Sequence, residues 1–248
     1  MAESEDVVTV SLAVLHAFGG AFDFILHQRE AATKGGVPVG GPGYIWTFAR
    51  TQLEVSAVAL GGSIAIALPA GLVLGHLGRG EFFAVGFGNA GRAVPEIAVV
   101  FLLAAVIGVG IGNVAIALMV LGVPPILTNT YVAIRQVDQD AVQAARGMGM
   151  TELGVLLRVE LPLGVPTIMG GVRTSAINII ATATIASFVG YSDLGDFITQ
   201  QQVYGTDGAV AGAILVAFLA ITAEVVLAGV QSALTPKGLK LQREAARE

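Results

Sequence analysis

The residues of this chain that could carry out catalysis or bind a metal are few and scattered. Its three histidines, His16, His27 and His76, form neither an H-E-x-x-H motif nor a pair four residues apart, so we interpret each as structural or interfacial. No serine lies in a G-x-S-x-G motif. The absence of cysteine excludes disulfides, thiolate catalysis and cysteine-based zinc sites. We therefore predict no catalytic residue, no metal site and no cofactor.

The most informative segment is polar and rich in glycine, and it lies between two long apolar runs. It reads QAARGMGMTELGVLLRVELP, from Gln143 to Pro162. Asp138 or Asp140 can cap a first short helix, and Gly147 and Gly149 can end it. The alanine- and glycine-rich body of this helix would let the backbone of another protein approach closely. We therefore predict a docking surface.

A second short helix follows in the same segment. Thr151 can cap it, and four leucines at helical spacing share one face: Leu153, Leu156, Leu157 and Leu161. Pro162 and Pro166 are expected to close this helix before the next apolar run. Arg146 adds a positive charge at the end of the first helix, where a partner would meet it.

The composition indicates that lipid surrounds most of the chain. Of its 248 residues, 54% are hydrophobic and only 12% are charged, and its mean hydropathy is +0.78. A soluble domain has roughly twice that share of charged residues. Glycine and proline, of which there are 33 and nine, are also better tolerated in membrane helices. The net charge of −5 and the lack of a basic stripe do not suggest nucleic-acid binding.

The apolar runs predict an all-α integral membrane protein with about five transmembrane helices. A spanning helix needs about 20 apolar residues. Five stretches reach or approach this length: Val55–Leu77, Ala90–Val109, Val114–Ile134, Val165–Gly190 and Ala209–Leu234. Pro124 and Pro125 are expected to bend or shorten the third helix.

The distribution of basic residues predicts the orientation in the membrane. Lysine and arginine concentrate in the central segment and in the C-terminal tail, whereas the loop Tyr191–Gly208 contains three aspartates and neither lysine nor arginine. Basic loops stay in the cytoplasm. We therefore expect the central segment and the tail inside and the N-terminus outside.

The chain is expected to comprise three parts. Residues 1–50 are predicted to be an extracytoplasmic segment with an interfacial helix, although VVTVSLAVLHAFGGAFDFIL is long enough for a sixth span. TKGGVPVGGPG, which follows, has the composition of a loop. Residues 51–238 form the transmembrane domain, with the loop 136–162 inside it, and residues 239–248 form a cytoplasmic tail.

Two acidic residues are candidates for the pathway or for a subunit interface. Glu96 follows Pro95 at the start of the second span, where it can pair with Arg92. Glu224 lies inside the fifth span, so we expect it to face the bundle interior or an interface. Arg173 is predicted to lie near the cytoplasmic end of the fourth span and to extend toward water.

The central segment resembles a pattern in the inner-membrane subunits of bacterial ABC importers. That pattern is E-A-A, three residues, Gly, nine residues, and I-x-L-P. Here Gln143-Ala144-Ala145, Gly149 and Val159–Pro162 match this spacing. Gln143 replaces the glutamate, which keeps the shape but removes the charge. The resemblance extends from about residue 51 to residue 238.

The resemblance implies a type I importer permease whose loop is a coupling helix seated in a cleft of a cytoplasmic ATPase. The implied coupling residues are Asp140, Gln143, Ala144, Ala145, Arg146, Gly147, Gly149, Leu161 and Pro162. It also implies a second permease subunit, identical or similar, and an extracytoplasmic substrate-binding protein. No Walker A motif occurs in the sequence, so the ATPase must be a separate chain.

The flanks of the loop narrow the expected solute. PPILTNTYVAIRQVD and VRTSAINIIATATIASFVGYSDLGDFI resemble importers of osmoprotectants such as glycine betaine, choline and carnitine. A permease for methionine or another amino acid is the alternative. A secondary transporter and a membrane enzyme are less well supported. The implied location is the bacterial inner membrane, with several spans.

Overall fold

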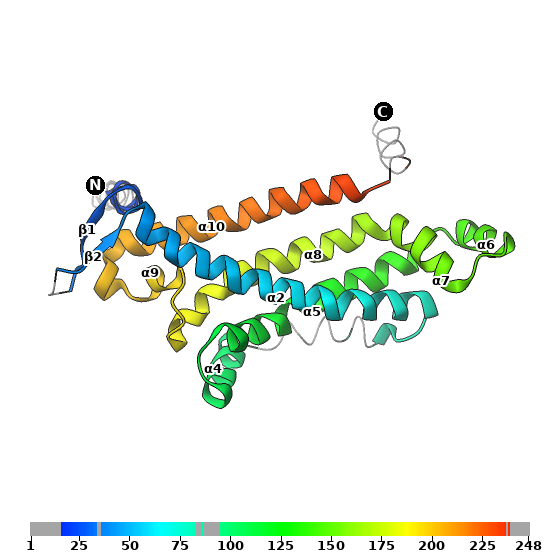
Figure 1. Cartoon of the computed structure of the whole chain (residues 1–248), viewed down its shortest axis with the longest axis horizontal. Helices are drawn as coiled ribbons and strands as arrows, with labels where there is room; N and C mark the ends of the chain where they lie inside the picture. The colour runs from blue at the N-terminus through cyan, green and yellow to red at the C-terminus, as the bar shows by residue number, and fades with distance from the viewer. Residues whose placement is uncertain (1–15, 34–35, 83–85, 87–94, 237, 239–248) are drawn as a thin grey trace, which may run out of the picture.

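The structure is a computed structural model that describes residues 16–33, 36–82, 86, 95–236 and 238. Within this part of the chain, four helices are long and apolar enough to cross a membrane (Figure 1). The short helices α6 (Gln139–Gly147) and α7 (Glu152–Val155) lie at one end of the elongated bundle. The strands β1 (Gln28–Glu30) and β2 (Pro38–Gly40) and the short helix α9 (Gly195–Thr199) lie at the other end. The segment predicted to be cytoplasmic and the loop predicted to be extracytoplasmic are therefore far apart.

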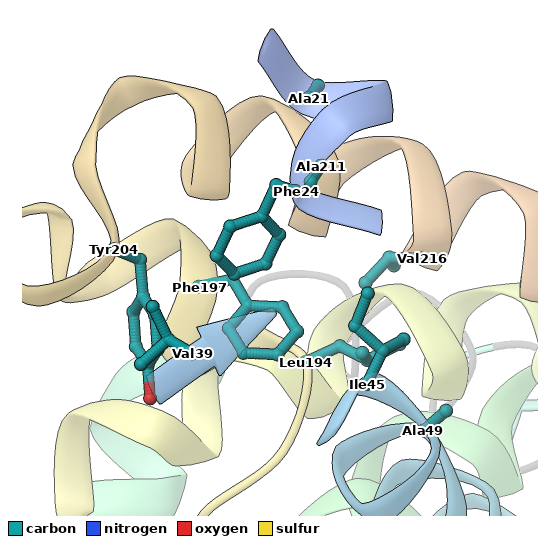
Figure 2. Close-up of a cluster of buried hydrophobic side chains, with 10 residues drawn as sticks. All are labelled: Ala21, Phe24, Val39, Ile45, Ala49, Leu194, Phe197, Tyr204, Ala211 and Val216. Atoms are coloured by element: carbon teal, nitrogen blue, oxygen red, sulfur yellow. The ribbon is translucent and has the colours of Figure 1, made fainter. Parts of the chain in front are cut away.

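The N-terminal segment packs onto the bundle at the end that contains α9. Residues 16–26 are helical, and strands β1 (Gln28–Glu30) and β2 (Pro38–Gly40) form an antiparallel hairpin. Phe24 is fully buried against Phe197 and Tyr204, with ring centroids 5.4 and 6.2 Å away (Figure 2). The predicted interfacial helix thus has one face packed on protein, and its residues before 16 lie outside the described part.

Helix α2 (Pro42–Leu77) begins well before the predicted start at Val55. Pro42 suits the first turn of a helix, because its missing N–H has no helical partner there. The stretch from Arg50 to Glu54 is polar, but these two residues, four apart, form an ion pair of 2.7 Å that suits a helix. The predicted loop before Val55 is therefore shorter than expected, since Pro38–Gly40 is a strand and Pro42 opens the helix.

The second predicted span is described only in part. Helix α4 (Glu96–Ile107) has 12 residues and ends at Gly108, whose φ is 82°. At 1.5 Å per residue it is about 18 Å long, which is less than the bilayer core. Residues 90–94 of the predicted span lie outside the described part of the chain.

Helix α5 (Ile111–Arg135) contains both Pro124 and Pro125 and continues beyond them, so the prediction that they shorten the third helix was wrong. In a membrane bundle, helix-breaking prolines are tolerated where neighbouring helices support the backbone. Close to the two prolines, the Ser175 hydroxyl of the neighbouring helix α8 (Leu161–Ala183) donates to the Gly122 carbonyl at 2.9 Å. Packing on both sides of α5 keeps it helical.

The fourth span is longer than predicted, because neither Pro162 nor Pro166 ends the preceding helix. Helix α7 (Glu152–Val155), a π-helical turn (Leu156–Glu160), α8 (Leu161–Ala183) and a 3-10 segment (Thr184–Val189) form one continuous rod. The π turn widens the helix before Pro162, which lacks an N–H donor. As a result, the end of the polar segment is rigidly joined to the fourth span.

The last span is α10 (Gln201–Leu234), preceded by the short helix α9 (Gly195–Thr199). It ends at the predicted residue but begins before the predicted Ala209, with a kink at Gly205, whose φ is 70°. Helix α5 packs between α2 and α8, and α10 packs on α8. Large apolar side chains of α2 and α10 remain exposed, which suits contact with lipid or another subunit: Ile66, Val73, Phe218, Ile221 and Val225.

Candidate functional site at the helical elbow

The segment 136–162, called the elbow from here on, forms two capped helices as predicted. Helix α6 (Gln139–Gly147) is capped by Asp138, whose carboxylate accepts from the Asp140 amide at 2.9 Å, so Asp138 and not Asp140 is the cap. Gly149 has φ of +82°, a conformation that turns the chain after α6. Thr151 caps α7 by accepting from the Gly154 amide at 3.2 Å.

A small apolar core holds the two helices of the elbow together. Its buried members are Val137, Val142, Ala145 and Val155. Ala145 is 2% exposed, so its side chain faces α7 and not a partner. Gln143, Ala144, Arg146, Gly147 and Gly149 are exposed, as is Asp140, whereas Leu161 and Pro162 are half-buried where α8 begins. Of the predicted coupling residues, Ala145 can therefore act only by positioning α6.

The outer side of the elbow carries an open groove of about 480 Å³. Met148, Gly149, Leu153 and Leu157 help to line it, and Met148 is 78% exposed. Leu153 and Leu157 share this exposed side, but Leu156 is buried on the other, so the four leucines do not share one face as predicted. Exposed apolar side chains around a groove at a polar end of the bundle are typical of a protein-binding surface.

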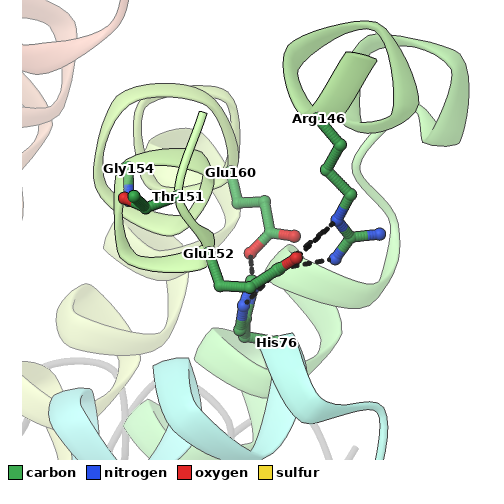
Figure 3. Close-up of polar contacts among 6 residues, drawn as sticks. All are labelled: His76, Arg146, Thr151, Glu152, Gly154 and Glu160. Atoms are coloured by element: carbon green, nitrogen blue, oxygen red, sulfur yellow. Dashed lines mark hydrogen bonds and ion pairs between the residues drawn. The ribbon is translucent and has the colours of Figure 1, made fainter. Parts of the chain in front are cut away.

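A network of ionisable side chains joins the elbow to the last turn of α2 (Figure 3). His76 Nδ1 lies 2.7 Å from Glu160 Oε2, and its Nε2 lies 3.2 Å from Glu152 Oε2. Arg146 of α6 donates to Glu152 at 2.8 Å, and this hydrogen bond raises the pKa of the Arg146 guanidinium. We call His76, Glu152 and Glu160 the clamp. Sequence reasoning missed it, because His76 and Glu160 are 84 residues apart.

The two acidic candidates in the spans have partners on neighbouring elements. Glu96 is the first residue of α4, and it accepts from the Thr182 hydroxyl at 3.1 Å. Its predicted partner Arg92 lies outside the described residues. Glu224 of α10 pairs with Arg173, whose Nε lies 2.9 Å from Glu224 Oε1. Arg173 thus lies near the middle of the long rod and pairs with a neighbouring helix, whereas the sequence predicts that it extends toward water.

Two of the three aspartates in the loop Tyr191–Gly208 are buried. Asp193 accepts from the Gly195 amide at 2.7 Å through Oδ1, but its Oδ2 has no partner among the described residues. Burial raises the pKa of Asp193 to about 7, and the carboxylate of Asp196 adds to the effect. Burial raises the pKa of Asp196 as well. The loop is therefore not simply the solvated acidic segment that its composition suggests.

We expect the stability of the fold to decrease as the pH rises, because of Asp193. The folded chain holds this proton up to about pH 7, whereas an unfolded aspartate releases it near its ordinary pKa of 3.8, so stability falls between these values. The effect is on the order of 4 kcal/mol. Thermal unfolding from about pH 5 to about pH 8 should show this slope in the wild type. Asp193→Asn should remove the slope, and Asp207→Asn, which breaks an ion pair with Arg29, should keep it.

Comparisons with known proteins identify the family of this chain. Residues 67–238 match the family model described as the binding-protein-dependent transport system inner membrane component. The chain is 37% identical to the carnitine transport permease protein OpuCB of Listeria monocytogenes over 201 residues, 81% of this chain and 91% of that protein. It is 36% identical to the choline transport system permease protein OpuBB of Bacillus subtilis over 206 residues, 83% and 94% of the two chains.

A solved structure supports the fold. The chain is similar to a chain of the MetNI methionine ABC transporter in an inward-facing conformation, with a TM-score of 0.67 and 19% identity, over 77% of this chain and 96% of that one. The family model covers the C-terminal end of α2 and every later span. The chain therefore belongs to the inner-membrane component family of binding-protein-dependent transport systems, as a permease subunit embedded in the membrane.

Proposed function

We propose that this chain is the membrane-spanning subunit of an ATP-driven importer for quaternary-ammonium osmoprotectants. The observation that carries the proposal is its identity of 36–37%, over about four-fifths of its length, to permeases named for carnitine, choline and glycine betaine. These solutes share a quaternary ammonium group. Such a group has no N–H to donate, and aromatic faces bind it. We place most of the selectivity in an aromatic site of the separate binding protein.

The elbow is the proposed contact with the ATPase. Its exposed groove contains Met148, Leu153 and Leu157, and the sequence lacks a Walker A motif, so ATP hydrolysis belongs to a separate cytoplasmic subunit. Two permease subunits, identical or similar, would enclose the pathway. When the ATPases close on ATP, the two elbows move together, and the bundles change between inward- and outward-facing states by rigid-body motion.

The solute assignment predicts a specific binding result. The binding protein encoded beside this chain should give a calorimetric signal with glycine betaine, choline or carnitine and none with methionine. Vesicles that contain the full complex should then import the same solute only when ATP is present on the ATPase side. A signal with methionine alone would favour the amino-acid importer.

Two other classes predict different outcomes in the same vesicles. A secondary transporter would import solute without the ATPase, driven by an ion gradient. A membrane enzyme would convert its substrate without moving it. Uptake by this chain alone, or chemical conversion of the solute, would therefore contradict the proposal.

A further inference from the structure

The elbow is joined through the chain itself to two spans. Helix α5 ends at Arg135, only a few residues before α6 begins at Gln139. On the other side, α7 continues without interruption into α8. A displacement of the elbow therefore acts directly on α5 and α8. Helix α2 has no such connection, because it ends at Leu77, far from the elbow in sequence.

The clamp joins α2 to the elbow. His76 is in the last turn of α2, and both of its ring nitrogens approach carboxylates of the rod that contains α7 and α8 (Figure 3). A hydrogen bond from a ring N–H to a carboxylate is charge-assisted, and such bonds are about twice as strong as neutral ones. The side chains of His76 and Glu160 are only 12% and 7% exposed, so water screens their interaction little.

The end of α2 is also held in place from its other side. A Cβ at Gly75 would lie 2.8 Å from the Ile134 Cβ, so only a glycine permits this approach to α5. Arg146 extends the clamp to α6 through Glu152. The last turn of α2 therefore contacts α5 on one side and both helices of the elbow, directly or through Glu152, on the other.

We infer that His76 is a positioning residue for transport: through Glu152 and Glu160 it makes α2 follow the elbow. This inference rests on the proposed function, in which the ATPase moves the elbow. With the clamp, each ATP-driven movement displaces α2, α5 and α8 together. Without it, α2 lags behind, so ATP is still hydrolysed but less solute is imported for each ATP.

The test is the number of ATP molecules hydrolysed per solute imported by the full complex in vesicles. His76→Gln retains one amide donor group but not two ring nitrogens that can reach Glu152 and Glu160 together. We expect ATP hydrolysis within about twofold of the wild type and uptake lower by about tenfold, the factor that one charge-assisted hydrogen bond represents. His27→Gln is the matched control, because His27 pairs with Asp23 at 2.9 Å at the opposite end of the bundle. The number of ATP molecules that His27→Gln hydrolyses per solute imported should equal that of the wild type.

A covalent link distinguishes transmission of movement from a role in stability alone. The natural sequence has no cysteine, so His76→Cys with Glu160→Cys introduces the only two thiols in this chain. A short bifunctional methanethiosulfonate should join them and restore the ratio of ATP to solute, and reduction should remove the restoration.

Two results would overturn the inference while leaving the proposed function intact. One is a wild-type ratio in His76→Gln, and the other is a linked double variant that stays uncoupled. Absence of ATP-driven uptake in the wild-type complex would instead refute the proposed function, and the inference would fail with it.

Discussion

Replacing Met148 with glutamate is expected to abolish co-purification of the ATPase with this chain, while the chain itself stays inserted in the membrane. Met148 is the most exposed large apolar side chain of the elbow, at 78%. Its φ of −78° accepts any residue, so glutamate introduces no backbone strain. In the complex, the carboxylate would be buried against an apolar surface. Loss of one central contact of this kind weakens binding by about 2 kcal/mol or more, which is roughly 30-fold.

Gly149→Glu should have the same outcome, with an additional contribution from the backbone. Gly149 has φ of +82°, which is unfavourable for glutamate and tolerated by asparagine. Gly149→Asn therefore separates the effect of the charge from the effect of the backbone. If the charge is decisive, the asparagine variant should retain much of the ATPase binding that Gly149→Glu loses.

The matched control for both variants is Val37→Glu. Val37 is also an exposed apolar residue, at 61%, but it lies beside the hairpin at the opposite end of the bundle. This variant should co-purify with the ATPase as the wild type does. If Met148→Glu does so as well, the elbow is not the docking surface, and the proposed coupling role of residues 140–162 must be abandoned.

The parts of the elbow that could be predicted depend on local signals. A cap such as Asp138 or Thr151 bonds an amide within three residues of itself, so the sequence contains all that is needed to place it. The left-handed turn at Gly149 is equally local. The family pattern covers the same residues. These features were therefore predictable without any knowledge of how the spans pack.

The features that could not be predicted depend on contacts between distant segments. Hydropathy locates an apolar run but does not carry a helix across a polar stretch such as Arg50–Glu54, so the predicted start of α2 is too late. Helix α5 survives Pro124 and Pro125 because the helices packed beside it support its backbone. The burial of Ala145 and the position of His76 follow only once α7 and α2 are placed around the elbow.

The pairing of Arg173 with Glu224 also depends on contacts between distant segments. The Arg173 guanidinium pairs with Glu224 and also donates to Gln231 Oε1 at 2.7 Å, so three polar side chains join α8 to α10 between otherwise apolar surfaces. Glu224 lies ten residues before the end of α10 at Leu234, about 15 Å along the helix at 1.5 Å per residue and inside the predicted fifth span. A lone charge near the centre of a span costs about 2.5–3.5 kcal/mol on insertion scales.

Removing one partner of this pair is therefore expected to be far more damaging than removing both. Glu224→Ala leaves the arginine without its carboxylate, and the yield of folded, inserted chain should fall by roughly tenfold or more. Glu224→Ala combined with Arg173→Met leaves no unpaired charge and should recover most of the yield. The measurement is monodisperse protein after extraction in mild detergent.

The same variants test whether Glu224 also serves the pathway. If the pair only joins α8 to α10, the double variant should import solute at a rate in proportion to its recovered yield. If the carboxylate contacts the solute as well, the double variant should be folded yet transport poorly. If Glu224→Ala and the double variant give equal yields, the two charges do not depend on each other. Pairing would then not be the reason why Arg173 and Glu224 are tolerated in the spans.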